Sequence, residues 1–85
     1  MSYRIEISRV VRKQLEKIQK SDRLEIEKEI LKLSENPRPH AVKKMKGEEN
    51  VYRIRVGDYR VMYEIFDHVL RVIVIKVAHR REVYR

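Results

Sequence analysis

The chain has 85 residues, of which 42% are hydrophobic and 40% are charged. This length suits one domain, because two halves would each be too small to bury a stable core. The hydrophobic content is too high for a disordered polycation. Lysine and arginine outnumber aspartate and glutamate by 21 to 13, giving a formal net charge of +8. Such a charge favours a polyanionic partner, with nucleic acid first and an acidic protein second.

The sequence predicts a soluble, cytoplasmic protein in which residues 1–85 form the single domain. The longest uninterrupted apolar run covers residues 72–75, against about 20 residues for a transmembrane helix. The amino-terminal residues carry no apolar block of the signal-peptide kind. Cysteine is absent, which excludes disulfides, cysteine nucleophiles and thiolate metal sites.

The first half of the sequence predicts a strand followed by two helices. Residues 3–7 alternate apolar and polar side chains, and Ser8 is a favourable helix N-cap. Apolar residues then recur at helical spacing and restart after Asp22, which with Glu25 resembles a capping box. The second helix ends at the Asn-Pro-Arg-Pro segment, residues 36–39, because proline cannot donate a backbone hydrogen bond.

The second half predicts a basic loop and then strands only. Residues 40–50 show no period. Three later segments alternate as strands do: 52–56, 59–66 and 69–77. The order β-α-α-β-β-β predicts an α+β fold, with an N-terminal strand and a helical hairpin packed on a mainly antiparallel twisted sheet.

The predicted first hairpin gathers three arginines on one exposed face of the sheet. A two-residue turn at Gly57-Asp58 puts Arg55 opposite Arg60, with Arg53 on the same face. Charged residues on a strand usually contact only solvent. Like charges directly opposite each other destabilise a sheet, however, unless an anion lies between them. We therefore interpret this face as an anion site.

A second two-residue turn, at residues 67–68, would extend the arginine face. It pairs Glu64 with Arg71 and Tyr63 with Val72. The alternation then brings four residues of the last strand onto the arginine face: Ile73, Ile75, Val77 and His79. Three further candidates follow just beyond the strand: Arg80, Arg81 and Tyr84.

No motif for metal-dependent or acyl-transfer chemistry is present. The sequence lacks HExxH, a glycine-rich phosphate loop and a Ser-His-Asp set that the fold would bring together. We therefore expect neither a metal nor a cofactor.

Residues 52–65, YRIRVGDYRVMYEI, and residues 77–84, VAHRREVY, closely resemble the RelE branch of the RelE/ParE toxin superfamily. The likeness extends over nearly the whole chain, and the two motifs G-x-Y-R-x-x-Y and H-R-x-x-x-Y are fairly specific together. Members of this branch are toxins that cut mRNA in the ribosomal A site. The resemblance implies metal-independent cleavage, in which the ribose 2′-hydroxyl attacks the adjacent phosphate. It also implies three partners: mRNA, the ribosome and a RelB-like antitoxin.

The resemblance assigns catalytic roles to six residues: Arg53, Arg55, Arg60, His79, Arg80 and Tyr84. The arginines would hold the phosphate, and His79 or Tyr84 would transfer protons. Well-studied relatives carry lysines at the positions of Arg53 and Arg55, and arginine cannot deprotonate to act as a base. Further RNA contacts are expected from four basic residues: Lys43, Lys44, Lys46 and Arg81.

Two other functions remain open at this point. A ParE-like toxin would inhibit DNA gyrase by binding, without catalysis, and the fold alone does not separate it from a ribonuclease. A basic RNA-binding module would use the same arginines without a role for His79 or Tyr84. The set of phosphate-handling residues favours the ribonuclease.

Overall fold

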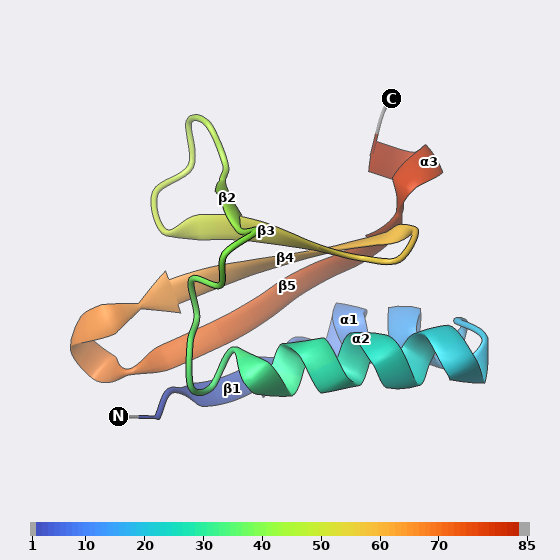
Figure 1. Cartoon of the computed structure of the whole chain (residues 1–85), viewed down its shortest axis with the longest axis horizontal. Helices are drawn as coiled ribbons and strands as arrows, with labels where there is room; N and C mark the ends of the chain where they lie inside the picture. The colour runs from blue at the N-terminus through green and yellow to red at the C-terminus, as the bar shows by residue number, and fades with distance from the viewer. Residues whose placement is uncertain (1, 84–85) are drawn as a thin grey trace.

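The protein is built from two layers, a five-stranded sheet and a pair of helices that cover one of its faces (Figure 1). A computed structural model describes residues 2–83. Its elements are β1 (Arg4–Ile7), α1 (Arg9–Glu16), α2 (Lys20–Lys32), β2 (Lys43–Lys44), β3 (Val51–Val56), β4 (Tyr59–Phe66), the 3-10 helix η1 (Asp67–Val69), β5 (Arg71–His79) and α3 (Arg80–Val83). The strand order is β1-β5-β4-β3-β2, and only the β1–β5 pair among these is parallel. The predicted α+β fold with a mainly antiparallel sheet is confirmed.

The two long helices begin by different means. At α1 the side-chain oxygen of Ser8 accepts a hydrogen bond from the backbone N–H of Val11 at 3.2 Å, as predicted for an N-cap. The predicted cap of α2 is wrong, because α2 begins at Lys20 and Asp22 lies inside its first turn. There the carboxylate still stabilises the helix through its dipole. No helix within residues 2–83 is long and apolar enough to cross a membrane.

The core lies between the helices and one face of the sheet. Five buried residues come from the helical half: Val11, Leu15, Ile26, Ile30 and Leu33. Eight come from the strands: Ile54, Val56, Val61, Tyr63, Ile65, Val72, Val74 and Val77. The opposite face of the sheet, here called the outer face, has no long helix over it in Figure 1. Polar and charged side chains of the strands therefore point to this face.

The first hairpin has the predicted register. Six residue pairs join β3 to β4, from Val51 opposite Glu64 to Val56 opposite Tyr59, and Arg55 lies opposite Arg60. The turn needs a residue that tolerates positive φ, and Gly57 supplies it at φ 58°.

The second hairpin differs from the prediction. Its turn is longer, because η1 and Leu70, which has a left-handed backbone at φ 52°, separate the two strands. Tyr63 lies opposite Val74 and not Val72, and Glu64 lies opposite Ile73 and not Arg71. Both predicted pairs are therefore wrong.

A β-bulge in β5 changes which side chains reach the outer face. Tyr63 pairs with Val74 but Met62 pairs with Lys76, so Ile75 is the extra residue. Beyond the bulge the alternation is reversed, and Val77 turns into the core. The backbone N–H of Val77 donates a hydrogen bond to Oε1 of Gln14 on α1 at 2.9 Å. Helix α1 therefore stabilises the strand next to the bulge.

The segment predicted as a loop, residues 40–50, contains a short strand that the sequence did not predict. Lys43 pairs with Arg53 and Lys44 pairs with Tyr52, which makes β2 an edge strand beside β3. Two residues are too few to show a strand period, so pairing and not pattern defines this element.

Removing the hydroxyl of Tyr63 is expected to destabilise the fold. Tyr63 is fully buried, and its hydroxyl donates a 2.7 Å hydrogen bond to the carbonyl of Pro37, which anchors the segment after α2. Burial also raises the pKa of this phenol. Tyr63→Phe leaves a buried carbonyl without its donor, at a cost of about 1–3 kcal/mol in unfolding free energy. Urea denaturation measures the loss.

Tyr52→Phe is the matched control for this variant. Tyr52 is only half-buried, and its hydroxyl lies at the longer distance of 3.4 Å from Nε of Arg38. A smaller loss is expected at this position. Equal losses for the two variants would contradict the role given to the Pro37 hydrogen bond.

Candidate functional site

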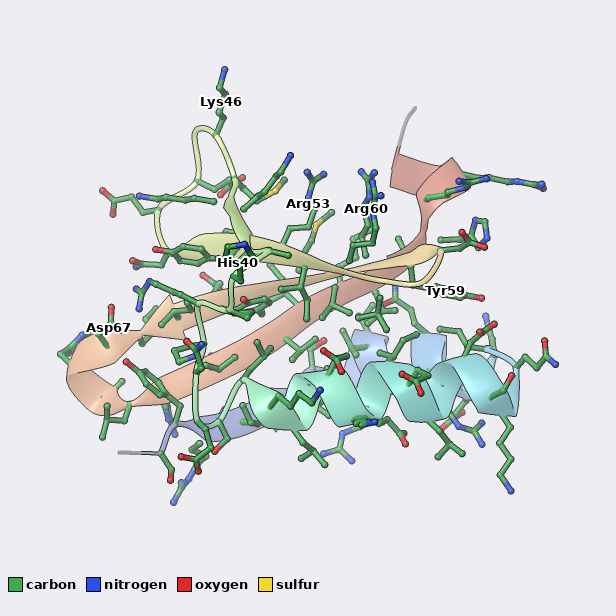
Figure 2. The ribbon with its side chains drawn as sticks, viewed as in Figure 1. His40, Lys46, Arg53, Tyr59, Arg60 and Asp67 are labelled. Atoms are coloured by element: carbon green, nitrogen blue, oxygen red, sulfur yellow. The ribbon has the colours of Figure 1, made fainter. Side chains whose placement is uncertain are left out.

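The outer face contains a small cationic hollow of about 260 Å³, and we call it the arginine hollow. Its lining residues are Ala41, Lys43, Arg53, Arg55 and Arg60. Figure 2 shows Arg53 and Arg60 extending from the sheet on the side away from α2. Four of the five lining residues are cationic and none of the five is acidic, so the hollow suits an anion. Its volume is below the range of about 300–1,000 Å³ for cofactor and drug-sized ligands, which favours a phosphate group.

Strand pairing explains how the arginine hollow forms. Alternation along β3 puts Arg53 and Arg55 on the outer face, and the hairpin register sets Arg60 beside Arg55. Strand β2 sets Lys43 beside Arg53. The predicted convergence of the three arginines is confirmed, whereas Ala41 was missed because it lies in a segment without a period.

Arg60 is more buried than the sequence suggested. Only 3% of its surface is exposed, although the prediction placed it on an exposed face. Arg55, its neighbour across the hairpin, is exposed, and Arg53 is half-buried. A guanidinium confined in this way is held in position, and charge interactions there are screened less than in water.

His79 does not join the arginines, so its predicted place on the arginine face is wrong. It lies opposite Tyr59 on the helix side of the sheet, and the two rings meet edge to face with centroids 5.2 Å apart. Both residues line a separate hollow of about 330 Å³, and its other lining residues are Gln14, Lys17, Ile18 and Val77. The bulge in β5 is the cause, because it moves His79 from the outer face to the inner one.

Helix α3 begins beside the β3–β4 turn. The backbone N–H of Arg80 donates to the carbonyl of Asp58 at 2.7 Å, and Nε of Arg80 lies 3.9 Å from a carboxylate oxygen of the same residue. Figure 1 shows α3 on the outer side of the sheet, at the end nearest this turn. Arg80 and Arg81 are exposed there. Tyr84 lies outside the described residues.

The remaining lysines of the prediction lie apart from the arginine hollow. Lys44 and Lys46 line a separate hollow of about 470 Å³ with Glu48 and Glu49, in the loop between β2 and β3. Figure 2 shows Lys46 at the tip of this loop. Only Lys43 of the predicted lysines contributes to the arginine hollow. Within residues 2–83, no group of three acidic or histidine side chains is arranged to hold a metal ion.

Comparison with known proteins identifies the family. Residues 5–84 match the family described as the ParE toxin of type II toxin-antitoxin systems, parDE. The protein belongs to the RelE/ParE toxin superfamily. The toxin is 31% identical over 88 residues to RelE1 of Methanocaldococcus jannaschii, an alignment covering 100% of this chain and 98% of that one. It is 44% identical to toxin RelE3 of the same organism over 43 residues, 51% of this chain and 47% of that one.

Solved structures place the toxin with the RelE type. The RelE chain in the RelE–RelB complex of Pyrococcus horikoshii superposes with a TM-score of 0.84 at 29% identity, covering 94% of this chain and 97% of that one. The isolated RelE toxin of E. coli gives 0.81 at 29% identity, covering 98% and 92%. The toxin is therefore a type II toxin of RelE type, as the resemblance predicted.

A second charged cluster of the toxin is internally paired and has a structural role. The carboxylate of Asp67 in η1 accepts hydrogen bonds from the Tyr3 hydroxyl at 2.7 Å and from both terminal nitrogens of Arg38 at 3.0 and 2.8 Å. These bonds lower the pKa of Asp67 to about 2. The Arg38 guanidinium also lies over the Tyr52 ring, 5.1 Å from its centroid. The cluster thus joins four segments that are distant in sequence.

The stability of the toxin should depend on pH through Asp67. Its folded pKa of about 2 lies below the unfolded value of about 3.9, so the carboxylate stabilises the fold fully above that value. The contribution is lost as the pH falls from about 4 towards 2. Asp67→Asn should therefore lower Tm more at pH 7 than at pH 3, measured by circular dichroism. Glu49→Gln, in the β2–β3 loop, is the control, and an Asp67→Asn effect equal at both pH values would contradict the ionic role.

Proposed function

We propose that the toxin is a ribonuclease that cleaves mRNA in the ribosomal A site without a metal ion. One observation carries the proposal: Lys43, Arg53, Arg55 and Arg60 line a single hollow of phosphate size. In the reaction the ribose 2′-oxygen bonds to phosphorus and the bond from phosphorus to the 5′-oxygen breaks. The products are a 2′,3′-cyclic phosphate and a 5′-hydroxyl.

The arginine hollow supplies what the transition state of this reaction needs. Negative charge increases on the phosphate oxygens as the 2′-oxygen attacks, and guanidinium groups can donate paired hydrogen bonds to it. Arg55 and Arg60 lie directly opposite each other, so a phosphate bound between them would contact both guanidinium groups. Because Arg60 is almost fully buried, its position is set before the substrate binds.

The reaction also requires a base for the 2′-hydroxyl and an acid for the leaving 5′-oxygen. Arginine stays protonated and serves neither as the base nor as an efficient acid. The edge-to-face contact with Tyr59 holds His79 on the other side of the sheet. Of the two residues to which the resemblance gives proton transfer, His79 and Tyr84, we therefore choose Tyr84, and we assign to Arg80 a place among the phosphate contacts.

An antitoxin is the second partner in the proposal. The solved relatives include RelE bound to RelB from Pyrococcus horikoshii and from E. coli. A RelB-like antitoxin would neutralise a chain of net charge +8 through an acidic segment. Three basic residues outside the arginine hollow are proposed as further RNA contacts: Lys44, Lys46 and Arg81.

Mapping of mRNA 5′ ends tests the proposal. Purified toxin is added to ribosomes translating a defined message, and to the same message without ribosomes. Cuts inside the reading frame that require ribosomes, and that leave a 2′,3′-cyclic phosphate and a 5′-hydroxyl, are the expected result. A DNA gyrase supercoiling assay runs in parallel, because ParE is the named toxin of the matching family. Intact mRNA with blocked supercoiling would overturn the ribonuclease in favour of a ParE-like inhibitor.

A further inference from the structure

A row of side chains crosses the outer face from the edge strand β2 to β5. The pairings place Lys43 of β2 opposite Arg53 of β3, Arg53 opposite Met62 of β4, and Met62 opposite Lys76 of β5. Residues opposite each other in neighbouring strands share a face. These four residues, here called the cationic row, therefore lie side by side, and Lys43 and Lys76 at its two ends are exposed.

Lys76 reaches the outer face because of the bulge in β5. An uninterrupted alternation would put Ile75 and Val77 on this face and turn Lys76 towards the helices. The extra residue at Ile75 reverses the order, and the hydrogen bond from Val77 N–H to Gln14 Oε1 stabilises the reversed strand. The fold therefore places a positive charge where the sequence pattern predicts apolar side chains.

The neighbouring rows show where an anion can and cannot lie. On one side of the cationic row, Arg55 and Arg60 complete the arginine hollow. On the other side, Glu64 of β4 pairs with Val51 of β3 and with Ile73 of β5. A polyanion is attracted along the cationic row and repelled from the row that contains Glu64. The positive surface is thus a band that runs across the strands.

The cationic row is longer than a single phosphate group can cover. Adjacent strands are about 4.8 Å apart, so Arg53 and Lys76 are separated by roughly 10 Å and the full row spans roughly 14 Å. A phosphate in the arginine hollow contacts Arg53 and leaves Lys76 to a different phosphate. Single-stranded RNA presents such phosphates in series, and backbone-tracking grooves of basic residues are the usual means of binding it.

We propose that Lys76 binds the phosphate next to the one held in the arginine hollow, so that the RNA strand crosses the sheet from β3 towards β5. This inference rests on the proposed function, because it takes RNA as the anion. It assigns a role to a residue that the alternating sequence pattern places on the helix side of the sheet, away from the site.

The salt dependence of RNA binding tests the role of Lys76. Binding of a 2′-O-methyl oligoribonucleotide, which lacks the attacking hydroxyl, is measured by fluorescence anisotropy at several salt concentrations. Loss of one phosphate contact should reduce the slope of log K against log salt by about 0.7 for a single strand. We expect this reduction for Lys76→Gln. Lys28→Gln, at an exposed position on α2, should keep the parent slope, and Lys76→Arg should restore it.

The outcomes separate this inference from the proposed function. If the parent toxin cuts mRNA and Lys76→Gln keeps the parent slope, the inference is wrong and the ribonuclease stands. If the parent toxin cuts no RNA but Lys76→Gln has a shallower slope, the RNA-binding band is supported and the cleavage proposal fails. An equal reduction for Lys28→Gln would overturn the inference, because the effect would then reflect net charge alone.

Discussion

Replacing Arg60 by alanine is expected to slow mRNA cleavage by about 10²- to 10³-fold. Removal of one preorganised electrostatic contact to a transition state typically has an effect of this size. Arg60 lines the arginine hollow, lies opposite Arg55, and is held in place by its burial, with 3% of its surface exposed. The single-turnover rate on ribosome-bound message, measured at saturating toxin, reports the loss.

Burial makes a folding control necessary for this variant. An arginine stem packs its methylene groups against neighbours, so Arg60→Ala also removes packing and should lower Tm. Cleavage is therefore compared at a temperature where circular dichroism shows both proteins fully folded. Arg9→Ala, an exposed arginine at the start of α1, is the matched control for net charge. A folded Arg60→Ala protein that cuts at the parent rate would remove Arg60 from the site.

Local signals predicted the parts of the fold that local interactions determine. Ser8 caps α1 because its side chain reaches a backbone N–H three residues away. Gly57 sets the first turn, and a turn of known length fixes every pair along β3 and β4. The convergence of Arg53, Arg55 and Arg60 follows from that register alone. This half of the candidate site was therefore predictable from the sequence.

The second hairpin depends on interactions that no local pattern contains. Its turn includes a 3-10 helix, and Asp67 in that helix is held by Tyr3 and Arg38 from distant parts of the chain. Next to the bulge, the backbone N–H of Val77 donates a hydrogen bond to Gln14, a residue of α1 far away in sequence. An alternating pattern cannot reveal an inserted residue, because Ile75 and Val77 are equally suited to either face. The alternating pattern consequently placed His79 on the outer face and Lys76 on the inner face, whereas the structure has them the other way round.

Sequence patterns also could not predict that Arg60 is buried or that Lys43 lines the arginine hollow. Arginine is rarely buried, so composition predicts exposure at position 60. Lys43 reaches the arginine hollow through a two-residue strand, which has no period to detect. Both features arise from how β2 and the hairpin lie in three dimensions. They show that the shape of the hollow, unlike its charge, comes from tertiary structure.

Proton transfer should depend on Tyr84 and not on His79. Tyr84→Phe keeps the ring and removes only the hydroxyl, so stacking on a base would persist while proton transfer would cease. We expect the single-turnover rate to fall by about 10²- to 10⁴-fold, the usual contribution of general acid-base catalysis, with RNA binding unchanged. Binding of the 2′-O-methyl oligoribonucleotide, measured in parallel, separates the two roles.

His79→Ala is the counterpart that makes this prediction decisive. His79 contacts Tyr59 on the helix side, and its Nδ1 accepts a 3.3 Å hydrogen bond from the backbone N–H of Arg81. Its loss should therefore lower Tm slightly through this contact and leave the cleavage rate within about threefold, a difference below 1 kcal/mol in barrier height. A large rate loss for His79→Ala in the folded state, together with a normal rate for Tyr84→Phe, would reverse the assignment. Because the sheet separates His79 from the arginine hollow, that result would require the RNA to contact both faces of the sheet at the end of β5.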